Sequence, residues 1–257
     1  MGGLSRKYTV IDKITGSDNI ENLVIDSGNF LFSSPKPRSL NTQAIHKANG
    51  IAEIYREMNY DAVNMGPSDL AAGIGYLKNL DFLPWVCSNF YDNAGKSIFK
   101  KFIIKSKSKI RYGIIGLSTQ PLNPSKEFNY KPWQAILPAI IQELHEKVDC
   151  IILLSSLNDK ENKDIVQNFP EIRLLFSSLS TSGNKSPQIV NKAVLTQTAN
   201  RGKYLGQLYL VNPGLHDWTE PSAHQKTSKE NMRKTIEYRL SRINFLMSQN
   251  NNNTNIL

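Results

Sequence analysis

The stretch that most constrains the fold reads Tyr60-Asp-Ala-Val-Asn-Met-Gly-Pro-Ser-Asp-Leu-Ala-Ala-Gly73. Its apolar residues Ala62, Val63 and Met65 predict a short buried strand, and Gly66-Pro67 predicts a tight turn that ends the strand. A helix is expected to begin directly after this turn. In open α/β sheets, ligand-binding and catalytic groups lie where strands turn into helices. The turn at residues 66–69 is therefore the first place to look for a functional site.

Helices and strands alternate on both sides of this stretch. Helices are predicted at residues 2–15, 41–59, 132–147 and 160–168. Strands are predicted at residues 22–26, 83–87, 150–155, 172–176, 193–198 and 204–211, with a hairpin formed by 97–105 and 109–117. The Ser/Gly-rich stretch 177–187 is predicted to be a loop. An alternating middle part followed by antiparallel strands predicts an α/β fold, a two-sheet sandwich flanked by helices.

The chain is long enough for one main domain and a C-terminal extension. With 257 residues and 40% hydrophobic residues it can bury a large core. We expect a domain over residues 1–220, then an amphipathic helix and a disordered Asn-rich tail within residues 221–257. No run of about 18 apolar residues is present, so no membrane span is expected. Residues 1–7 lack the apolar stretch of a signal peptide.

The turn resembles a segment of the metallophosphoesterases, and of their 5′-nucleotidase branch in particular, that normally reads Gly-Asn-His-Asp or Gly-Asn-His-Glu. In that family the Asn is a metal ligand and the His helps to protonate the leaving group. Here Gly66-Pro67-Ser68-Asp69 places Pro67 and Ser68 at those two positions. The resemblance runs from Gly2 to about Val211.

Other positions of the resemblance have also lost the family's metal ligands. Asp26-Ser27-Gly28 is similar to a strand end whose last Asp bridges two metal ions, and Asn29 stands there in this chain. A family strand ends Leu-Ser-His, and here the His position is Ser156. The family motif Gly-His-x-His falls on residues 176–180, which places Ser178 and Ser180 at two further ligand positions.

The family's first motif, Asp-x-His, lies on a strand before a Gly-Gly-Leu similar to Gly2-Gly3-Leu4, and this sequence begins after it. The fold is therefore expected without the usual first strand. We expect the strand Leu23–Asp26 to have one side unpaired or filled by another segment. The nucleotidase C-terminal domain, which stacks the base between aromatic rings, has no counterpart in the sequence.

These replacements predict a protein without hydrolase activity and without a metal or other cofactor. A dinuclear site needs carboxylate and imidazole ligands to hold two cations and activate water, and hydroxyl groups do not replace them. Asp26 and Asp69 remain as a less favoured weak Mg²⁺ site, while Asp69 is expected to complement the dipole of the helix it begins. The alternative is a metal-dependent phosphatase or 5′-nucleotidase with an atypical site.

Other catalytic residue types offer little support for an enzyme. None of the four histidines shows the spacing of metal ligands. No Gly-x-Ser-x-Gly motif or partner base accompanies Ser27, Ser68 or Ser156. The two cysteines, Cys87 and Cys150, are predicted to be buried free thiols because no cysteine framework surrounds them.

The formal charge of +9 favours an acidic partner. One group of cations surrounds the predicted hairpin: Lys96, Lys100, Lys101, Lys105, Lys107, Lys109 and Arg111. Nucleic-acid binding there is less favoured than a solvated sheet edge protected by lysines. The resemblance implies an exported protein and a large multihaem cytochrome complex as a partner.

The C-terminal helix, residues 228–247, is predicted to be a docking element. It carries an apolar stripe at steps of three and four residues: Met232, Ile236, Leu240, Ile243 and Met247. A basic surround suits an acidic protein surface. The alternative is that the stripe packs on the chain's own sheet. The expected function is thus a binding, accessory or assembly factor for a larger protein complex.

Overall fold

A computed structural model describes residues 3–16, 21–35, 40–121, 126–179, 183–199, 202, 204–210 and 218. Contacts within the chain separate Met1–His216 from Asp217–Leu257. The first unit contains the fold, and the predicted docking helix at residues 228–247 lies outside the described residues. Within the described part of the chain, no helix is long and apolar enough to cross a membrane.

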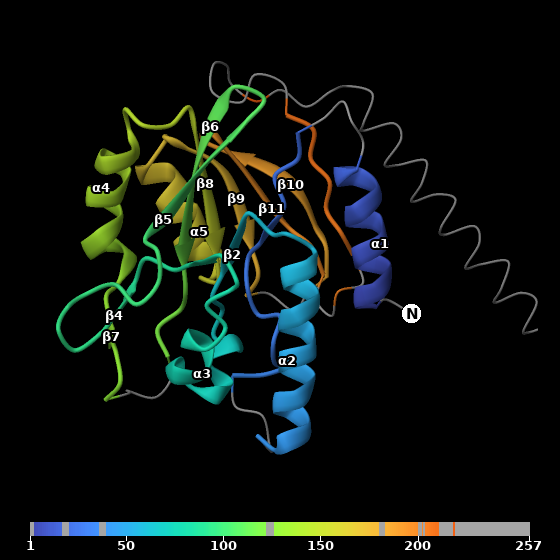
Figure 1. The fold of residues 1–257 in the computed structure, drawn as a ribbon. Helices are drawn as coiled ribbons and strands as arrows, with labels where there is room; N and C mark the ends of the chain where they lie inside the picture. The colour runs from blue at the N-terminus through green and yellow to red at the C-terminus, as the bar shows by residue number, and fades with distance from the viewer. Residues whose placement is uncertain are drawn as a thin grey trace, which may run out of the picture. The chain divides into compact units, whose positions relative to one another are not determined.

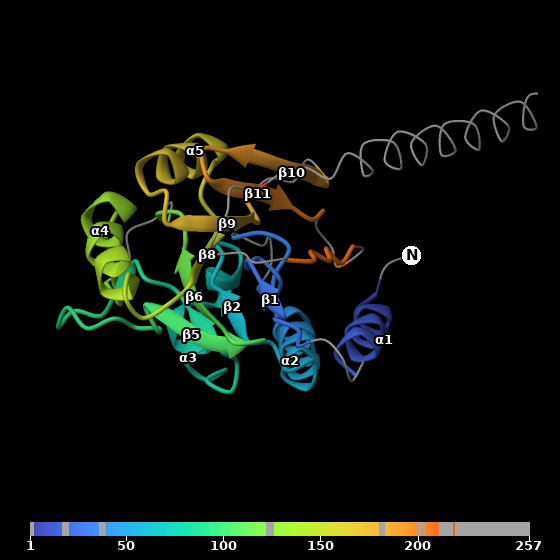
Figure 2. The ribbon, with the colours of Figure 1, turned by 90° about the horizontal axis from the view of Figure 1, so that it is seen from above.

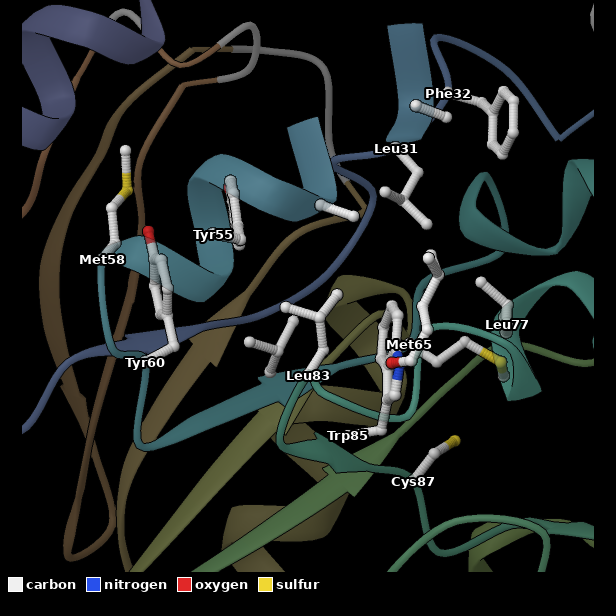
Figure 3. Close-up of a cluster of buried hydrophobic side chains, with 14 of the residues drawn as sticks. Leu31, Phe32, Tyr55, Met58, Tyr60, Met65, Leu77, Leu83, Trp85 and Cys87 are labelled. Carbon is white, nitrogen blue, oxygen red and sulfur yellow. The ribbon is translucent and has the colours of Figure 1, made fainter. Parts of the chain in front are cut away.

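The smaller sheet has three short parallel strands in the order β1-β2-β3. These are β1 (Ile25–Asp26), β2 (Ala62–Asn64) and β3 (Trp85–Val86). The helices that pack near them are α1 (Leu4–Thr15), α2 (Thr42–Glu57) and α3 (Ile74–Lys78). The Asn41 side chain caps α2 by accepting a hydrogen bond from the Ala44 N–H at 2.9 Å. A cluster of apolar side chains between sheet and helices, including Tyr55, Met65 and Trp85, forms one core (Figure 3).

The larger sheet has six strands in the order β10-β11-β9-β8-β6-β5. They are β5 (Phe102–Lys107), β6 (Ile110–Leu117), β8 (Cys150–Ser155), β9 (Ile172–Ser177), β10 (Lys185–Val190) and β11 (Ala193–Gln197). The four inner strands are parallel, and both edge strands run antiparallel to their neighbours. Helices α4 (Trp133–Leu144) and α5 (Asp159–Asn168) lie on one face of this sheet (Figure 1). A two-stranded ribbon pairs β4 (Phe90–Tyr91) with β7 (Asn129–Tyr130).

The two sheets pack against each other as the sequence predicts. Alternate residues of β6 and β8, such as Ile115 and Leu153, join the core under α4 and α5. Because side chains alternate along a strand, the residues between them face the smaller sheet. Gly116 lets the sheets approach closely, since a Cβ there would clash with the Val86 carbonyl oxygen and lie 2.6 Å from Asn64 Oδ1. The fold is a two-sheet α/β sandwich flanked by helices.

Two predictions about the second half were wrong. The predicted loop 177–187 contains the start of β10, which tolerates Pro187 because it is an edge strand with a register shift between Lys185 and Gln188. The predicted strand 204–211 is not a strand over its described residues 204–210. The predicted hairpin is confirmed with its turn at Ser108-Lys109, where both residues have a positive φ.

Three other local predictions agree with the structure. Cys87 and Cys150 are buried free thiols. Among the described residues, β1 pairs on one side only, with β2, as expected for the strand at Leu23–Asp26. The lysine-rich strand β5 is likewise an edge of its sheet. The Nζ atoms of Lys105 and Lys107 lie 3.3 and 3.7 Å from Asp61 Oδ1. The lysine pairing supports the interpretation of a protected sheet edge.

Candidate functional site

The candidate site lies where β1, β2, β8 and β9 end. The parallel pairings β1–β2 and β8–β9 bring the carboxyl end of each strand to the same edge of its sheet. Ser155 of β8 is opposite Ser177 of β9, so the next residues, Ser156 and Ser178, leave the sheet side by side. By alternation, both side chains point to the face that packs on the smaller sheet. The fold thereby brings Ser156 and Ser178 to the loop that follows β1.

Three side chains converge on the backbone carbonyl of Ser27. Ser178 Oγ lies 2.7 Å from this oxygen, Ser156 Oγ 3.2 Å and Asn64 Nδ2 3.1 Å. The two serine hydroxyls are also 2.8 Å apart. Each hydroxyl carries a single proton, so only two of the three contacts that the hydroxyls make are hydrogen bonds at one time. Asn64 is fully buried and also donates to the Leu117 carbonyl at 3.0 Å.

Asn29 connects this cluster to the turn after β2. Its Nδ2 donates toward Ser178 Oγ at 3.2 Å, and its Oδ1 accepts a hydrogen bond from the Ser68 N–H at 2.9 Å. Its φ of 66° lies in the left-handed region, where Asn is enriched. Gly66 packs directly on it, because a Cβ on Gly66 would lie 2.6 Å from the Asn29 nitrogen. Asn29, Ser156 and Ser178 therefore form one hydrogen-bonded network with the Ser68 backbone.

Asp69 connects the loop after β1 to the turn after β2, whereas the sequence predicts that it complements a helix dipole. The side chain is completely buried and accepts four backbone N–H groups: Asn29 and Gly66 at 2.7 and 2.8 Å on Oδ2, Phe30 and Leu31 at 3.0 and 2.9 Å on Oδ1. Burial raises its pKa to about 6, although the N–H donors oppose this. Asp69 begins the short 3₁₀ helix η1 (Asp69–Ala72). Three of the four donors lie in the loop after β1, so Asp69 binds that loop and does not serve mainly as a dipole partner of η1.

Asp26 belongs to a second, half-buried group of hydrogen-bonded side chains. Lys7 Nζ and Tyr55 Oη lie 3.3 and 2.9 Å from Asp26 Oδ2, and the Gly28 N–H donates to Oδ1 at 2.9 Å. Burial by itself lowers the pKa of Lys7, but the interactions with Asp26 and Tyr60 together outweigh it and raise the pKa above its ordinary value. The Lys7 ammonium also lies 4.9 Å from the ring centroid of Tyr55.

Lys7 was missed by the sequence analysis, although a signal for it was present. Leu4, Ile11 and Ile14 form the apolar stripe of α1, and Lys7 falls on the same stripe. A charged residue at such a position needs a buried partner, and Asp26 supplies it here.

The residues at the site do not fit the dinuclear metal centre that the resemblance implies. Pro67 offers no side-chain donor, and Asn29, Ser68, Ser156 and Ser178 supply neutral groups only. Both carboxylates already accept several hydrogen bonds from the protein. Within the described part of the chain, no group of three His, Cys, Asp or Glu residues is placed to hold a metal ion. Ser180, His216 and His224 lie outside the described residues, His46 is exposed on α2, and His145 is exposed directly after α4.

The structure resembles solved phosphoesterases, whereas no protein-family model and no curated protein matches the sequence. A 5′-nucleotidase precursor from Thermus thermophilus superposes with a TM-score of 0.63 at 19% identity, over 76% of this chain and 43% of that one. For the calcineurin-like phosphoesterase YfkN from Bacillus subtilis these values are 0.65, 15%, 79% and 74%. For the NAD nucleotidase of Haemophilus influenzae they are 0.59, 20%, 72% and 34%.

At these identities the likeness shows the fold alone. The fold is that of 5′-nucleotidases and calcineurin-like phosphoesterases. This chain spans less than half the length of the two nucleotidases.

Proposed function

We propose that this chain is a catalytically inactive protein of metallophosphoesterase fold that works by binding another protein, as an accessory or assembly factor. The observation that carries the proposal is the hydrogen-bonded network of Asn29, Ser156 and Ser178 around the Ser27 carbonyl. The resemblance places metal ligands of the family at these positions. Here the side chains bind each other and the backbone, and their groups are uncharged.

The remaining carboxylates do not compensate for this loss. Hydrolysis of a phosphate ester at such a site requires cations that polarise the phosphoryl oxygens and lower the pKa of a bound water. Holding cations requires negative charge from several ligands. Asp69 has two oxygens that each accept two backbone N–H groups, and Asp26 is paired with Lys7. Neither carboxylate can turn to a cation without releasing the loop it holds.

The test is an assay of the purified chain with p-nitrophenyl phosphate, a phosphodiester and AMP, each with Mn²⁺, Zn²⁺ or Mg²⁺. We expect no turnover above the blank and no Mn²⁺ binding by calorimetry. Metal-dependent turnover that is lost in a variant carrying Asn29→Ala and Ser178→Ala would overturn the proposal in favour of a phosphatase with an atypical site. As a matched control, Ser106→Ala changes a serine in β5, away from the cluster.

The charge of the chain indicates the kind of protein partner. A formal charge of +9 favours an acidic surface, and association with it should weaken as salt concentration rises. A multihaem cytochrome complex is the partner class that the resemblance implies. Isolation of the protein from its native source at low and high salt, with identification of the proteins that stay bound, tests this. A partner that is retained equally at both salt concentrations would contradict an acidic interface.

A further inference from the structure

The structure divides the cations around the hairpin into two groups. In the first group, Lys105 and Lys107 lie 3.3 and 3.7 Å from Asp61 Oδ1, and Arg111 pairs with Asp149 at 2.7 Å. A second group is exposed and forms no ion pair with any described residue: Lys96, Lys100, Lys101, Lys126 and Lys131. The second group therefore carries positive charge that no neighbouring carboxylate neutralises.

The five lysines of the second group lie on one paired piece of backbone, which we call the basic ribbon: residues 89–101 and 126–131. Its centre is the pair β4–β7, and residues 97–98 pair with the other side of β4. The Lys131 N–H donates to the Asn89 carbonyl at 3.0 Å. Neighbouring strands lie about 4.8 Å apart, so the three paired segments span about 10 Å. One bound segment of chain can therefore contact lysines from all three.

The basic ribbon holds few acidic groups that could oppose its lysines. Its two acidic residues are Asp92 and Glu127. Asp92 Oδ1 accepts the N–H groups of Ala94 and Lys96 at 3.0 and 2.8 Å, so this carboxylate is part of the turn. Helix α4 begins directly after the ribbon, with neither a side-chain cap nor an acidic residue in its first turn. The partial positive charge of this helix N-terminus adds to that of Lys131.

The basic ribbon offers charge but no aromatic surface. Phe90 is fully buried, and Tyr91 is 6% exposed, with its ring centroid 4.2 Å from the Lys131 Nζ. Among the described residues of the ribbon, no large aromatic side chain is exposed. Proteins that hold single-stranded nucleic acids combine positive charge with exposed aromatic rings on which the bases stack. The surface therefore fits carboxylates better than it fits nucleic-acid bases.

We propose that the basic ribbon is the surface on which this chain binds an acidic segment of its partner protein, rich in Asp and Glu. The carboxylates of such a segment would pair with Lys96, Lys100, Lys101 and Lys131. The backbone of the ribbon is already ordered by its pairing, so binding orders side chains only. The inference rests on the proposed binding function, and it adds the surface and the chemistry of the bound segment.

The test uses a fluorescein-labelled peptide of alternating Glu and Ser, and the same peptide with Gln in place of Glu. Binding to the full chain is measured by anisotropy at low and high salt. Carbodiimide coupling of the peptide's carboxylates, followed by mass spectrometry, identifies the lysines that contact it. We expect the Glu peptide alone to bind, more weakly at high salt, and to couple mainly to the lysines of the basic ribbon.

Two double variants of equal net charge separate a local surface from the overall charge. Lys100→Glu with Lys131→Glu reverses two charges on the ribbon, and Lys13→Glu with Lys47→Glu reverses two at exposed positions of α1 and α2. Figure 2 shows α1 and α2 on the opposite side of the molecule from α4, and Figure 1 agrees. The ribbon variant should bind the Glu peptide about tenfold more weakly, and the helix variant should bind it as the wild type does. Lys100→Gln with Lys131→Gln adds no repulsive charge and should show a smaller loss, which keeps the test valid if the Glu replacements disturb folding.

Several results would overturn this assignment. Equal weakening by the two Glu double variants would do so, because binding would then follow net charge alone, and so would no binding at about 1 mM peptide. Tighter binding of an oligothymidylate of similar charge would assign the ribbon to a nucleic acid. Coupling mainly at lysines outside the ribbon would refute the surface and leave the proposed binding function intact. Metal-dependent turnover would refute the proposed inactivity and leave the peptide data unaffected, so the two failures are distinguishable.

Discussion

Replacing Gly66 with alanine should destabilise the protein, because the added methyl group would overlap Asn29 and force apart the close contact between Gly66 and Asn29. A Cβ at this position would lie 2.5 Å from Asn29 Oδ1 and 2.6 Å from the Asn29 nitrogen, and still nearer to Asn29 Cγ. Ordinary contacts of a Cβ begin near 3.4 Å. Asn29 must therefore move by almost 1 Å, and the loop after β1 must move with it.

The cost of this displacement can be estimated from the bonds that Asn29 makes. Its N–H donates to Asp69 and its Oδ1 accepts from the Ser68 N–H, and a buried N–H without an acceptor costs about 1–3 kcal/mol. Forcing a methyl group into a packed site costs about 1–3 kcal/mol more. We expect a loss of about 2–6 kcal/mol in the free energy of unfolding, or roughly 10 °C in Tm.

Urea denaturation followed by tryptophan fluorescence measures this loss. Trp85 of β3 stacks on Phe30, which lies in the loop after β1 together with Asn29, and the ring centroids are 5.6 Å apart. Gly50→Ala is the matched control. Gly50 lies inside α2 with nothing within 4 Å of its Cβ position, so alanine there should stabilise by about 0.5–1 kcal/mol.

A second variant isolates the clash itself. In an Asn29→Gly background two of the three clashing atoms are absent, so Gly66→Ala should cost less than in the wild type. The reasoning is refuted if the free energy of unfolding of Gly66→Ala lies within about 0.5 kcal/mol of the wild-type value, a difference typical of neutral surface substitutions.

Three further predictions concern packing, pH and the buried ion pair. Gly116→Ala should cost at least about 3 kcal/mol in chemical denaturation, since its Cβ would lie 2.7 Å from the Val86 carbonyl carbon; an unchanged midpoint would contradict the sheet packing. The pKa of Asp69 is about 6 when folded and about 4 when unfolded, so the contribution of Asp69 to the free energy of unfolding is full below pH 4 and is lost as pH rises to 6. The wild type and Asp69→Asn are denatured at several pH values, and the difference between their free energies of unfolding should change by about 3 kcal/mol over that window. A constant difference would argue against the raised pKa of Asp69. Lys7→Met should destabilise by about 3 kcal/mol by leaving Asp26 without its cation, and adding Asp26→Asn should recover much of this loss; a fully stable Lys7→Met would contradict the buried pair.

Much of the fold could be predicted from short-range patterns in the sequence. The apolar run of β8, the helix after Asn41 and the turn at Gly66-Pro67 each depend on residues within a few positions of one another. Burial, capping and turn chemistry act over that range, so these elements appear where the sequence predicts them. That Asn29, Ser156 and Ser178 stand where the motifs of the resembled family have an Asp and two His residues is also read from the sequence.

Only the tertiary structure decided which distant segments the side chains of Asp69 and Lys7 and the backbone of several strands interact with. Asp69 begins a short helix, which predicts a dipole role, but its four N–H donors include three from a loop about forty residues earlier. Lys7 is paired by Asp26, and Pro187 is accepted in β10 because that strand has a neighbour on one side only. Residues 204–210 have the composition of a strand and lack one, since a strand exists only when another backbone lies beside it to share hydrogen bonds. Such pairings depend on which distant segments meet in space, and the local pattern of a sequence does not contain that information.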